Sequence, residues 1–398
     1  MRTAIVLFTR DLRVHDQPAL ATAAAGAERV LPLYVLDPAL EGRSPNRDRF
    51  LHQCLTDLRD TLRQRGGDLV VRRGDPVTET MRLAREVDAE GVAVSGDVSR
   101  HARERERRLW AECDEQRRAL RVFPGITVAD PGALAPAGGD HYRVFTPYYR
   151  AWLAAKWRTE LSAPRRIALP SGVDAGPLPA PPAGESPDAL AGGEREARRR
   201  LRGWLRRLDG YAQGHDVLAA DATSRLSPYL RFGCLSPLEL ANVVDDPASP
   251  FLRQLCWRDF YYQVASAFPK LSTVAYRPVA REAWRHDPEA LARWQEGETG
   301  VPLVDAGMRQ LQAEGWMHNR ARLVTADFLT KHLGLDWREG VRWFDRWLLD
   351  GDVPNNAGNW QWVAGTGNDT RSYRRFNPQR QAERFDPDGA YVGRYAAG

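Results

Sequence analysis

The segment GNWQW (358–362) places Trp360 and Trp362 one residue apart, and Arg374 follows in the polar stretch beyond it. Tryptophan packs well in a protein core, offers a flat face on which a nucleic-acid base can stack, and can be oxidised by one electron. Arginine binds phosphate through its planar guanidinium group. These residues are compatible with a packed corner of the protein core, a nucleic-acid-binding surface or a redox site. Their spacing alone does not distinguish among the three.

The segment DATSRLSPYL (221–230) combines hydroxyl groups with the start of a predicted helix. Thr223, Ser224 and Ser227 lie within five residues, and Pro228 can occupy the first position of a helix that Ser227 caps. Hydroxyls and free amides at a helix start can bind an anion such as a diphosphate. Simple capping by Ser227 is the other interpretation, and the commoner one.

The segment FLRQLCWRDFYYQV carries an aromatic and polar stripe. Gln254, Trp257, Arg258 and Tyr261 follow one another at three- and four-residue spacing and would share one face of a helix. Such a stripe either packs in the core or, because Gln and Arg flank it, faces a planar ligand in a cleft.

Two further segments, GWMHNRARL and LLDGDVPNNAG, carry charges that could pair. Arg320 and Arg322 need carboxylate partners if they are buried, and Asp350 and Asp352 are candidates. His318, taken alone, is more typical of a structural histidine than of a catalyst.

The elements that must position these residues follow a regular order. The first 130 residues alternate short apolar runs with helical patterns, which is typical of a parallel sheet covered on both faces. The expected strands are 4–8, 29–36, 68–72, 91–95 and 121–123, and the expected helices lie near 46–65, 76–88 and 100–119. The glycine motifs of dinucleotide-binding and P-loop proteins are missing from the sequence.

A proline-rich stretch, 163–193, predicts an extended connector over the surface, and the patterns after it are helical. We therefore expect an α/β plus all-α protein, with an N-terminal doubly wound, Rossmann-like parallel sheet and a C-terminal helical part. The predicted domains are 1–130 and 196–398, joined by the connector 131–195.

Composition excludes several classes of protein. The four cysteines are scattered, so neither a metal site nor a disulfide framework is expected. No apolar run approaches membrane-spanning length, and charge follows the N-terminus too soon for a signal peptide, so we expect a cytoplasmic location and no membrane partner. Arginine supplies nearly all of the positive charge, which reflects either phosphate recognition or the codon bias of a GC-rich genome.

Several segments, in order, resemble the DNA photolyase and cryptochrome family, closest to the bacterial class I cyclobutane pyrimidine dimer photolyases. The resemblance covers roughly residues 1 to 385. Its matching segments are TRDLRVHDQPAL (9–20), TSRLSPYL (223–230), QLCWRDFYYQ (254–263), WQEGETGVPLVDAGMRQLQAEGWMHNRAR (294–322), DWREG (336–340) and DGDVPNNAGNWQW (350–362).

The resemblance implies a flavin adenine dinucleotide (FAD) held in the helical domain, with Asn356 beside flavin N5 and an ion pair between Arg322 and Asp350 over the flavin. The residues implied to bind FAD are Tyr211, Thr223, Ser224, Arg225, Leu226, Ser227, Arg322, Asp350, Gly351, Asp352 and Asn356. It also implies an electron-transfer chain that photoreduces the flavin, from Trp284 at the surface through Trp337 to Trp360.

The implied substrate is UV-damaged DNA, with a crosslinked pyrimidine pair flipped out into a pocket above the flavin. Light would drive an electron from reduced FAD to the dimer, the ring would split, and the electron would return to the flavin. The protein is therefore expected to be a carbon–carbon lyase. The residues implied to contact DNA are Gln254, Trp257, Arg258, Asn319, Arg320, Trp362 and Arg374. We expect a monomer with no obligate protein partner.

The sequence departs from well-known members at two pocket positions, which carry Gln254 and Leu323 instead of Glu and Met. Glutamine also occurs in the branch that repairs (6-4) photoproducts, although that branch has a histidine where this chain has Asn319. Repair of (6-4) photoproducts and a cryptochrome-like blue-light receptor without repair activity are therefore the alternatives. The segment 97–109 lacks the Asn-Glu pair that holds a folate, so a light-collecting second chromophore could be a deazaflavin, another group, or absent.

Overall fold

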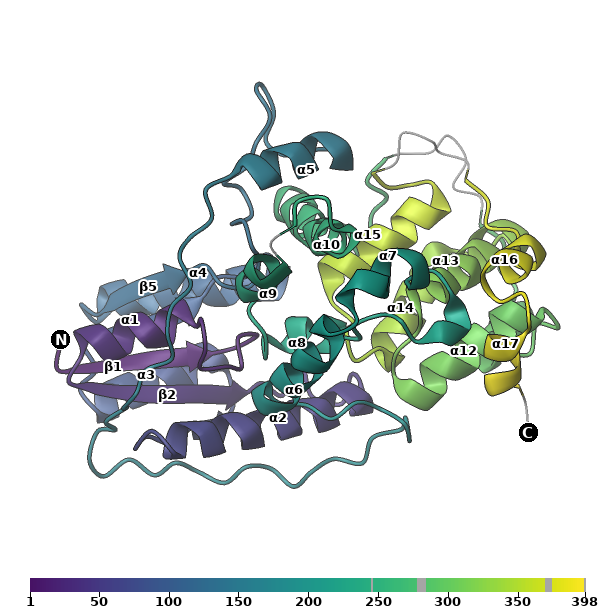
Figure 1. Cartoon of the computed structure of the whole chain (residues 1–398). Helices are drawn as coiled ribbons and strands as arrows, with labels where there is room; N and C mark the ends of the chain where they lie inside the picture. Colours follow the sequence, from purple (N-terminus) through teal and green to yellow (C-terminus); the bar gives the residue numbers. More distant parts are fainter. Residues whose placement is uncertain (245, 278–283, 369–373, 397–398) are drawn as a thin grey trace.

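The computed structural model describes residues 1–244, 246–277, 284–368 and 374–396. Its N-terminal part is built on five parallel strands in the order β3-β2-β1-β4-β5 (Figure 1). The strands are β1 (Thr3–Phe8), β2 (Arg29–Leu36), β3 (Val70–Arg73), β4 (Gly91–Ser95) and β5 (Ala119–Phe123). All five predicted strands are confirmed, with boundaries that differ by at most two residues.

Helices cover both faces of the sheet: α1 (Pro18–Gly26), α2 (Pro45–Arg63), α3 (Pro76–Glu86) and α4 (Arg100–Glu115). Because successive side chains of a strand point to opposite faces, Val6 packs in the core that includes α1 and α2, whereas Ile5 packs in the core that includes α3 and α4. The doubly wound sheet is thereby confirmed. Helix α1 was not predicted, because its run of alanines carries no clear apolar period.

The segment between the sheet and the helical part contains a helix that the sequence analysis missed, α5 (Phe145–Ala154). The described residues from 155 to 193 form neither helix nor strand, as expected of the proline-rich connector. The connector lies along the sheet edge, where Val71 N–H donates to Ala175 O at 2.8 Å. The domain boundaries at 130 and 195 stay predictions.

Beyond the connector, the described residues form helices and the loops between them, with one isolated bridge between Arg285 and Leu335. The longer helices are α6 (Glu194–Leu205), α9 (Pro237–Val244), α10 (Pro250–Ala267), α11 (Pro288–Glu296), α12 (Pro302–Glu314), α13 (Asn319–Asp327), α14 (Trp337–Trp347), α15 (Val353–Ala364) and α16 (Pro378–Phe385). The short ones are η1 (Leu208–Gly210), α7 (Tyr211–Gly214), η2 (Leu218–Ala220), α8 (Ser227–Phe232), the π-helical turn η3 (Phe328–His332) and α17 (Ala390–Arg394).

The two parts share one hydrophobic core that runs from β1 through α2 to α8 and α10. Phe50 of α2 packs against Phe232 of α8, with 4.9 Å between ring centroids. Gly233 follows α8 with a φ of +68°, and a Cβ atom there would lie 2.0 Å from Arg10 O. Only glycine fits this close approach, because it lacks Cβ and adopts positive φ. None of the described helices combines the length and apolar character that crossing a bilayer requires.

Candidate active site

Helices α8, α10, α13, α14 and α15 surround a cavity of about 440 Å³, a size typical of small-molecule sites. The cavity brings together residues that lie more than a hundred positions apart in the sequence. The residues predicted for FAD that line it are Tyr211, Thr223, Ser224, Arg225, Leu226, Ser227, Arg322, Asp350, Gly351, Asp352 and Asn356. The predicted DNA-contacting residues that line it are Gln254, Trp257, Arg258, Asn319 and Trp362, and Trp360 and Leu323 line it as well.

Two predicted tryptophans lie away from the cavity wall. Trp337 is fully buried at the start of α14, and Trp284 is half-buried against the same core as Trp337 and Trp360. Trp360 belongs to the same core as these two tryptophans and also lines the cavity. Their roles in electron transfer stay predictions.

Two predicted phosphate-binding arginines also lie outside the lining. Arg320 pairs with Asp216 at 2.7 Å and lies over the Phe385 ring, so its carboxylate partner is not one of the two aspartates expected from sequence. Arg374 is exposed and lies over the Trp362 ring, with 5.2 Å between its guanidinium carbon and the ring centroid.

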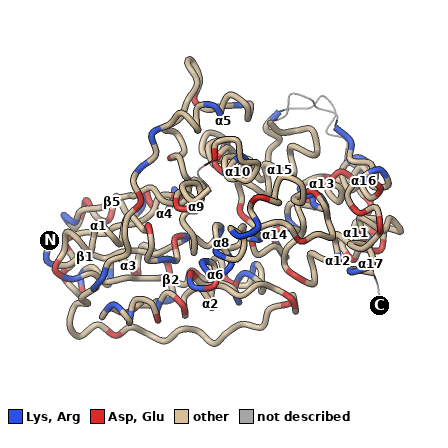
Figure 2. The backbone as a smooth tube through the Cα atoms, viewed as in Figure 1, with Lys and Arg blue, Asp and Glu red and all other residues tan. Residues whose placement is uncertain are grey.

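Ion pairs involve many of the arginines. Figure 2 shows Lys and Arg interspersed with Asp and Glu over both parts of the chain. At the cavity, Arg225 pairs with Glu314 at 2.6 Å and Arg322 with Asp350 at 2.8 Å. The abundance of arginine therefore does not by itself mark a phosphate-binding surface.

The TSRLS segment has a strained backbone. Arg225 adopts a φ of +51°, a conformation that side chains with a Cβ rarely adopt and that often marks functional sites. Ser227 is the first residue of α8 and makes no cap. Its hydroxyl donates instead to Asp350 Oδ2 at 2.6 Å. The capping interpretation of Ser227 was therefore wrong, because the carboxylate of a distant loop is a stronger acceptor within reach.

The expected Arg322–Asp350 ion pair is formed, and Arg322 Nε also donates to Met317 O at 2.8 Å. Two cavity-lining atoms, Asp350 Oδ1 and Thr223 Oγ1, are buried without a hydrogen-bond partner among the described residues. Such atoms are costly unless a ligand or water satisfies them. Hydroxyl, carboxylate and guanidinium groups around a largely apolar cavity fit a ligand that is both planar and polar, as FAD is.

Helix α15 carries Asn356 and Trp360 on neighbouring turns, so both face the cavity. Asp352 caps this helix by accepting from Asn355 N at 2.8 Å. Asn356 Nδ2 donates to Val341 O of α14 at 3.1 Å, which fixes the amide at the cavity wall.

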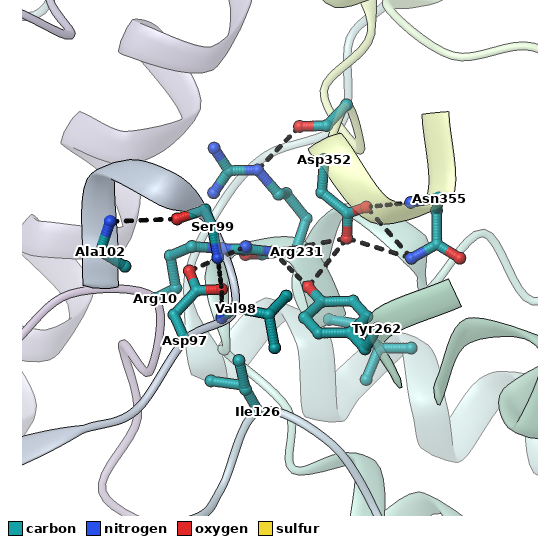
Figure 3. Close-up of polar contacts among 12 residues, drawn as sticks. Arg10, Asp97, Val98, Ser99, Ala102, Ile126, Arg231, Tyr262, Asp352 and Asn355 are labelled. Carbon is teal, nitrogen blue, oxygen red and sulfur yellow. Dashed lines mark hydrogen bonds and ion pairs between the residues drawn. The ribbon is translucent and has the colours of Figure 1, made fainter. Parts of the chain in front are cut away.

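Asp352 is also held from the N-terminal part of the chain (Figure 3). Tyr262 Oη donates to Asp352 Oδ2 at 2.9 Å and accepts from Arg10 Nη2 at 2.6 Å. Arg10 also contacts Asp352 Oδ2 at 3.4 Å and Asp97 Oδ2 at 3.1 Å. Burial tends to lower the pKa of Arg10, but Tyr262, Asp97 and Asp352 outweigh it and raise the pKa above its ordinary value. The carboxylate of Asp352 is thus engaged by protein donors, which makes it an anchor for the start of α15.

Changing Tyr262 to phenylalanine is expected to lower the free energy of unfolding by about 1–3 kcal/mol, because Asp352 and Arg10 each lose a buried partner. The variant should also retain less FAD, since the start of α15 loses a restraint. Denaturant unfolding and the flavin-to-protein absorbance ratio measure both effects. Tyr149→Phe, which removes only an exposed hydrogen bond to Pro247 O, is the control and should cost less. Equal losses in the two variants would contradict the anchoring role.

Trp360 is 2% exposed and packs against the ring of Phe344, with 4.9 Å between centroids, and that of Trp294, with 6.1 Å. A Cβ atom on Gly340 of α14 would lie 2.1 Å from Trp360 Cη2. The indole therefore lies directly on the backbone of the helix that begins with Trp337.

Sequence reasoning missed other cavity residues, among them Trp316, Phe344, Asn355 and Asn359. Trp316 lies within a segment already singled out, and Arg225 lies over its ring at 4.4 Å. The four-residue spacing of Asn355 and Asn359 is a helical signal that could have found them. Phe344 carries no such signal, because an apolar residue at a helical position is typical of any core.

His318 is a structural histidine, as its isolation in the sequence suggested. Its Nδ1 accepts from Arg320 N at 3.1 Å and caps α13, and it is 2% exposed. Burial is the main cause that lowers its pKa to about 4, and Arg320 and Arg322 act in the same direction, against the opposing charge of Asp216.

The low pKa of His318 predicts an acid-sensitive stability. The unfolded chain takes up a proton near pH 6.5 and the folded chain only near 4, so stability falls as pH falls through this window. Between about pH 7.5 and about pH 5 the expected contribution is a loss of about 2 kcal/mol. His318→Asn keeps a capping side chain and removes the titration, so the difference between the two proteins in denaturant unfolding isolates the effect. An identical pH dependence in both would refute it.

The described residues form no cluster of three or more His, Cys, Asp or Glu suited to a metal ion.

Two family models match the chain. Residues 4–166 match DNA photolyase, and residues 251–397 match the FAD binding domain of DNA photolyase.

Similar proteins span nearly the whole chain. A deoxyribodipyrimidine photo-lyase of Streptomyces griseus is 48% identical over 98% of this chain and 89% of its own length. A cryptochrome DASH of Natronomonas pharaonis is 36% identical over 98% of this chain and 89% of its own length.

Solved structures agree. A bacterial class III photolyase from Agrobacterium tumefaciens superposes with a TM-score of 0.93 at 33% identity, over 99% of this chain and 86% of that one. An archaeal photolyase from Sulfolobus tokodaii with two FAD molecules superposes with a TM-score of 0.89 at 30% identity, over 99% of this chain and 90% of that one. The resemblance to class I stays a prediction, but identity of this extent, on a shared two-part fold, shows that the chain belongs to the DNA photolyase family.

Proposed function

We propose that the protein repairs cyclobutane pyrimidine dimers in DNA in a light-dependent reaction that uses FAD bound in the cavity. The observation that carries this proposal is that one cavity is lined both by the residues suited to FAD and by Trp257, Trp362, Gln254 and Asn319. Cofactor and lesion would thus lie in contact, without a protein layer between them.

One group of cavity residues is suited to hold the cofactor. The backbone of the TSRLS segment and the unpartnered hydroxyl of Thr223 would hold the polar part of the cofactor, and the Arg322–Asp350 pair supplies fixed charges of both signs. Asn356 places a neutral amide at the wall, where it can donate or accept a hydrogen bond. When bound and reduced, FAD supplies the light-driven electron that opens the dimer ring.

A second group of cavity residues is suited to receive the lesion. Trp257 and Trp362 offer aromatic faces to extruded bases, and Gln254 and Asn319 offer amide groups that can hydrogen-bond their polar edges. A damaged pair is easier to extrude than an intact one, which favours the dimer over normal sequence. Arg374, exposed beside Trp362, is placed to meet a phosphate. Arg258 contributes its guanidinium group to the polar part of the cavity wall.

Two other activities remain in competition. Gln254 and Leu323 both line the cavity, and glutamine there is shared with (6-4) repair, whereas a photoreceptor would bind FAD and leave both lesions unchanged. The experiment illuminates oligonucleotides that carry one defined lesion each, a cyclobutane dimer or a (6-4) photoproduct, with and without a reductant. Loss of the dimer alone, only in light and with reduced FAD, is expected. Loss of the (6-4) lesion, or of neither, would overturn the proposal in favour of the corresponding alternative.

A second, light-collecting chromophore, whose identity the sequence leaves open, also remains a proposal. The Sulfolobus relative, described with two FAD molecules, adds a second flavin to the candidates. Acid release of the bound pigments from purified protein, followed by chromatography, identifies them, and a yield of more than one pigment per chain would support an antenna.

A further inference from the structure

The ring of Trp257 is stacked face to face on a residue from outside the helical part. Phe145, the first residue of α5, lies parallel to Trp257 with 3.7 Å between ring centroids and 4° between the ring planes. Phe145 is 4% exposed and does not line the cavity, whereas Trp257 does. One face of Trp257 is therefore covered, and its contact with the cavity is made through the remaining face and edges.

Hydrogen bonds between other residues of these two segments hold α5 and the residues before it against α10. Trp152 Nε1 of α5 donates to Asp259 Oδ2 of α10 at 2.9 Å. Ahead of α5, Tyr142 N donates to Gln263 Oε1 at 2.9 Å and Tyr142 O accepts from Gln263 Nε2 at 2.8 Å. These bonds join α10 to α5 and to the segment just before it, and the Phe145 ring takes part in none of them. Figure 1 shows α5 next to α10.

The two rings lie closer together than the roughly 4.5–7 Å between centroids at which isolated aromatic pairs usually meet. Packing of the two helices therefore imposes this close stack. Further side chains contact the stacked pair. Phe260 meets Trp257 edge-on at 5.5 Å, and Arg253 lies 4.9 Å from the centroid of Phe145. Trp257 is thus fixed on several sides before any ligand arrives.

We propose that Phe145 is a positioning residue for lesion recognition: it locks Trp257 in the orientation that receives an extruded pyrimidine dimer. The inference rests on the proposed function, because it gives Trp257 the role of a base-stacking platform. A locked platform loses no rotamer freedom when the base stacks on it, whereas a side chain that must be immobilised costs affinity. Undamaged DNA, which stays in its duplex, would not use the platform.

The test compares the affinities of FAD-loaded protein, kept in the dark, for a duplex with one cyclobutane dimer and for the same duplex undamaged. Phe145→Leu is expected to weaken binding to the dimer duplex about 2- to 10-fold and to leave binding to undamaged duplex unchanged. Phe145→Tyr keeps the stacked ring and should restore the preference. Tyr149→Leu is the matched control: it removes a ring that stacks on Phe145, at 5.6 Å, without reaching Trp257.

FAD content and thermal unfolding of each variant show whether the fold is kept, and Phe145→Met, which conserves volume better, takes the place of Phe145→Leu if that variant does not fold. A dimer preference that is unchanged in the ring-deleted variant would overturn the inference while leaving the proposed function intact. Equal loss of affinity for both duplexes would also overturn it, because it would indicate a general structural defect. A wild-type protein with no dimer preference would instead overturn the proposed function, and the inference with it.

Discussion

Replacing Trp360 by phenylalanine is expected to abolish the photoreduction of bound FAD and to leave dimer repair by chemically reduced protein intact. Phenylalanine keeps an aromatic ring against Phe344 and Trp294, so the cavity should retain its shape. What is lost is the indole, the group that can give up one electron at the cavity wall. The loss of oxidised-flavin absorbance under illumination, with an external electron donor present, measures photoreduction.

The matched control is Trp294→Phe. Trp294 is also fully buried and its ring lies 6.1 Å from that of Trp360, but it is not part of the predicted chain and does not line the cavity. It should photoreduce as the wild-type protein does. Undiminished photoreduction in Trp360→Phe, or equal loss in both variants, would remove the assignment of Trp360, Trp337 and Trp284 as an electron-transfer chain.

Replacing Gly340 by alanine should disrupt the FAD cavity through the packing of Trp360 on α14. The Cβ of Gly340→Ala would lie 2.1 Å from Trp360 Cη2, so the indole must move into the cavity or α14 must shift. Overpacking of this kind costs about 1–3 kcal/mol, and the displaced ring should also weaken FAD retention. Denaturant unfolding and flavin content of the purified variant measure the two effects.

Gly203, inside α6, provides the control because a Cβ there meets no atom closer than 3.9 Å. Gly203→Ala should therefore gain about 0.5–1 kcal/mol from helix propensity and keep its FAD. If Gly340→Ala is as stable and as rich in FAD as the control, the close packing of Trp360 on α14 is wrong.

The sequence predicted those parts of the structure whose signal is local. The five strands are short apolar runs between helical patterns, and all five were predicted correctly as strands. Burial was predicted wrongly for β5, where only Leu120 is buried, because β5 lies at the edge of the sheet. The stripe on 251–264 was correct for the same reason, since i, i+3 and i+4 spacing fixes a helical face whatever lies opposite. Helix α1 was missed because alanines provide propensity without periodicity, and α5 because its first turn lies in a segment dominated by turn-forming residues.

Long-range partners could not be predicted from spacing. Arg320 was expected to pair with Asp350 or Asp352, but it pairs with Asp216, which lies in a loop that no pattern places beside α13. The bond of Tyr262 to Asp352 and that of Arg10 to Tyr262 join three separate segments. Such contacts depend on how the two parts of the chain pack, and for that reason Asp352 was predicted as a flavin contact and not as the anchor of α15.

The role of individual residues at the cavity depends on the family resemblance more than on geometry. The structure brings Gln254, Trp257, Asn319 and Trp362 to one cavity, and the resemblance assigns these four residues to the lesion. The preference between lesions follows from whether the polar edges of the crosslinked bases match the amide groups of Gln254 and Asn319.

The most direct test of the central claim, that FAD and a pyrimidine dimer meet in one cavity, measures the emission of fully reduced bound FAD as DNA is added, together with the dimer content after illumination. DNA with a cyclobutane dimer should quench the emission, and the dimer should disappear in step with the light absorbed, while undamaged DNA changes neither. If dimer DNA binds but both the emission and the dimer content stay unchanged, the account is contradicted.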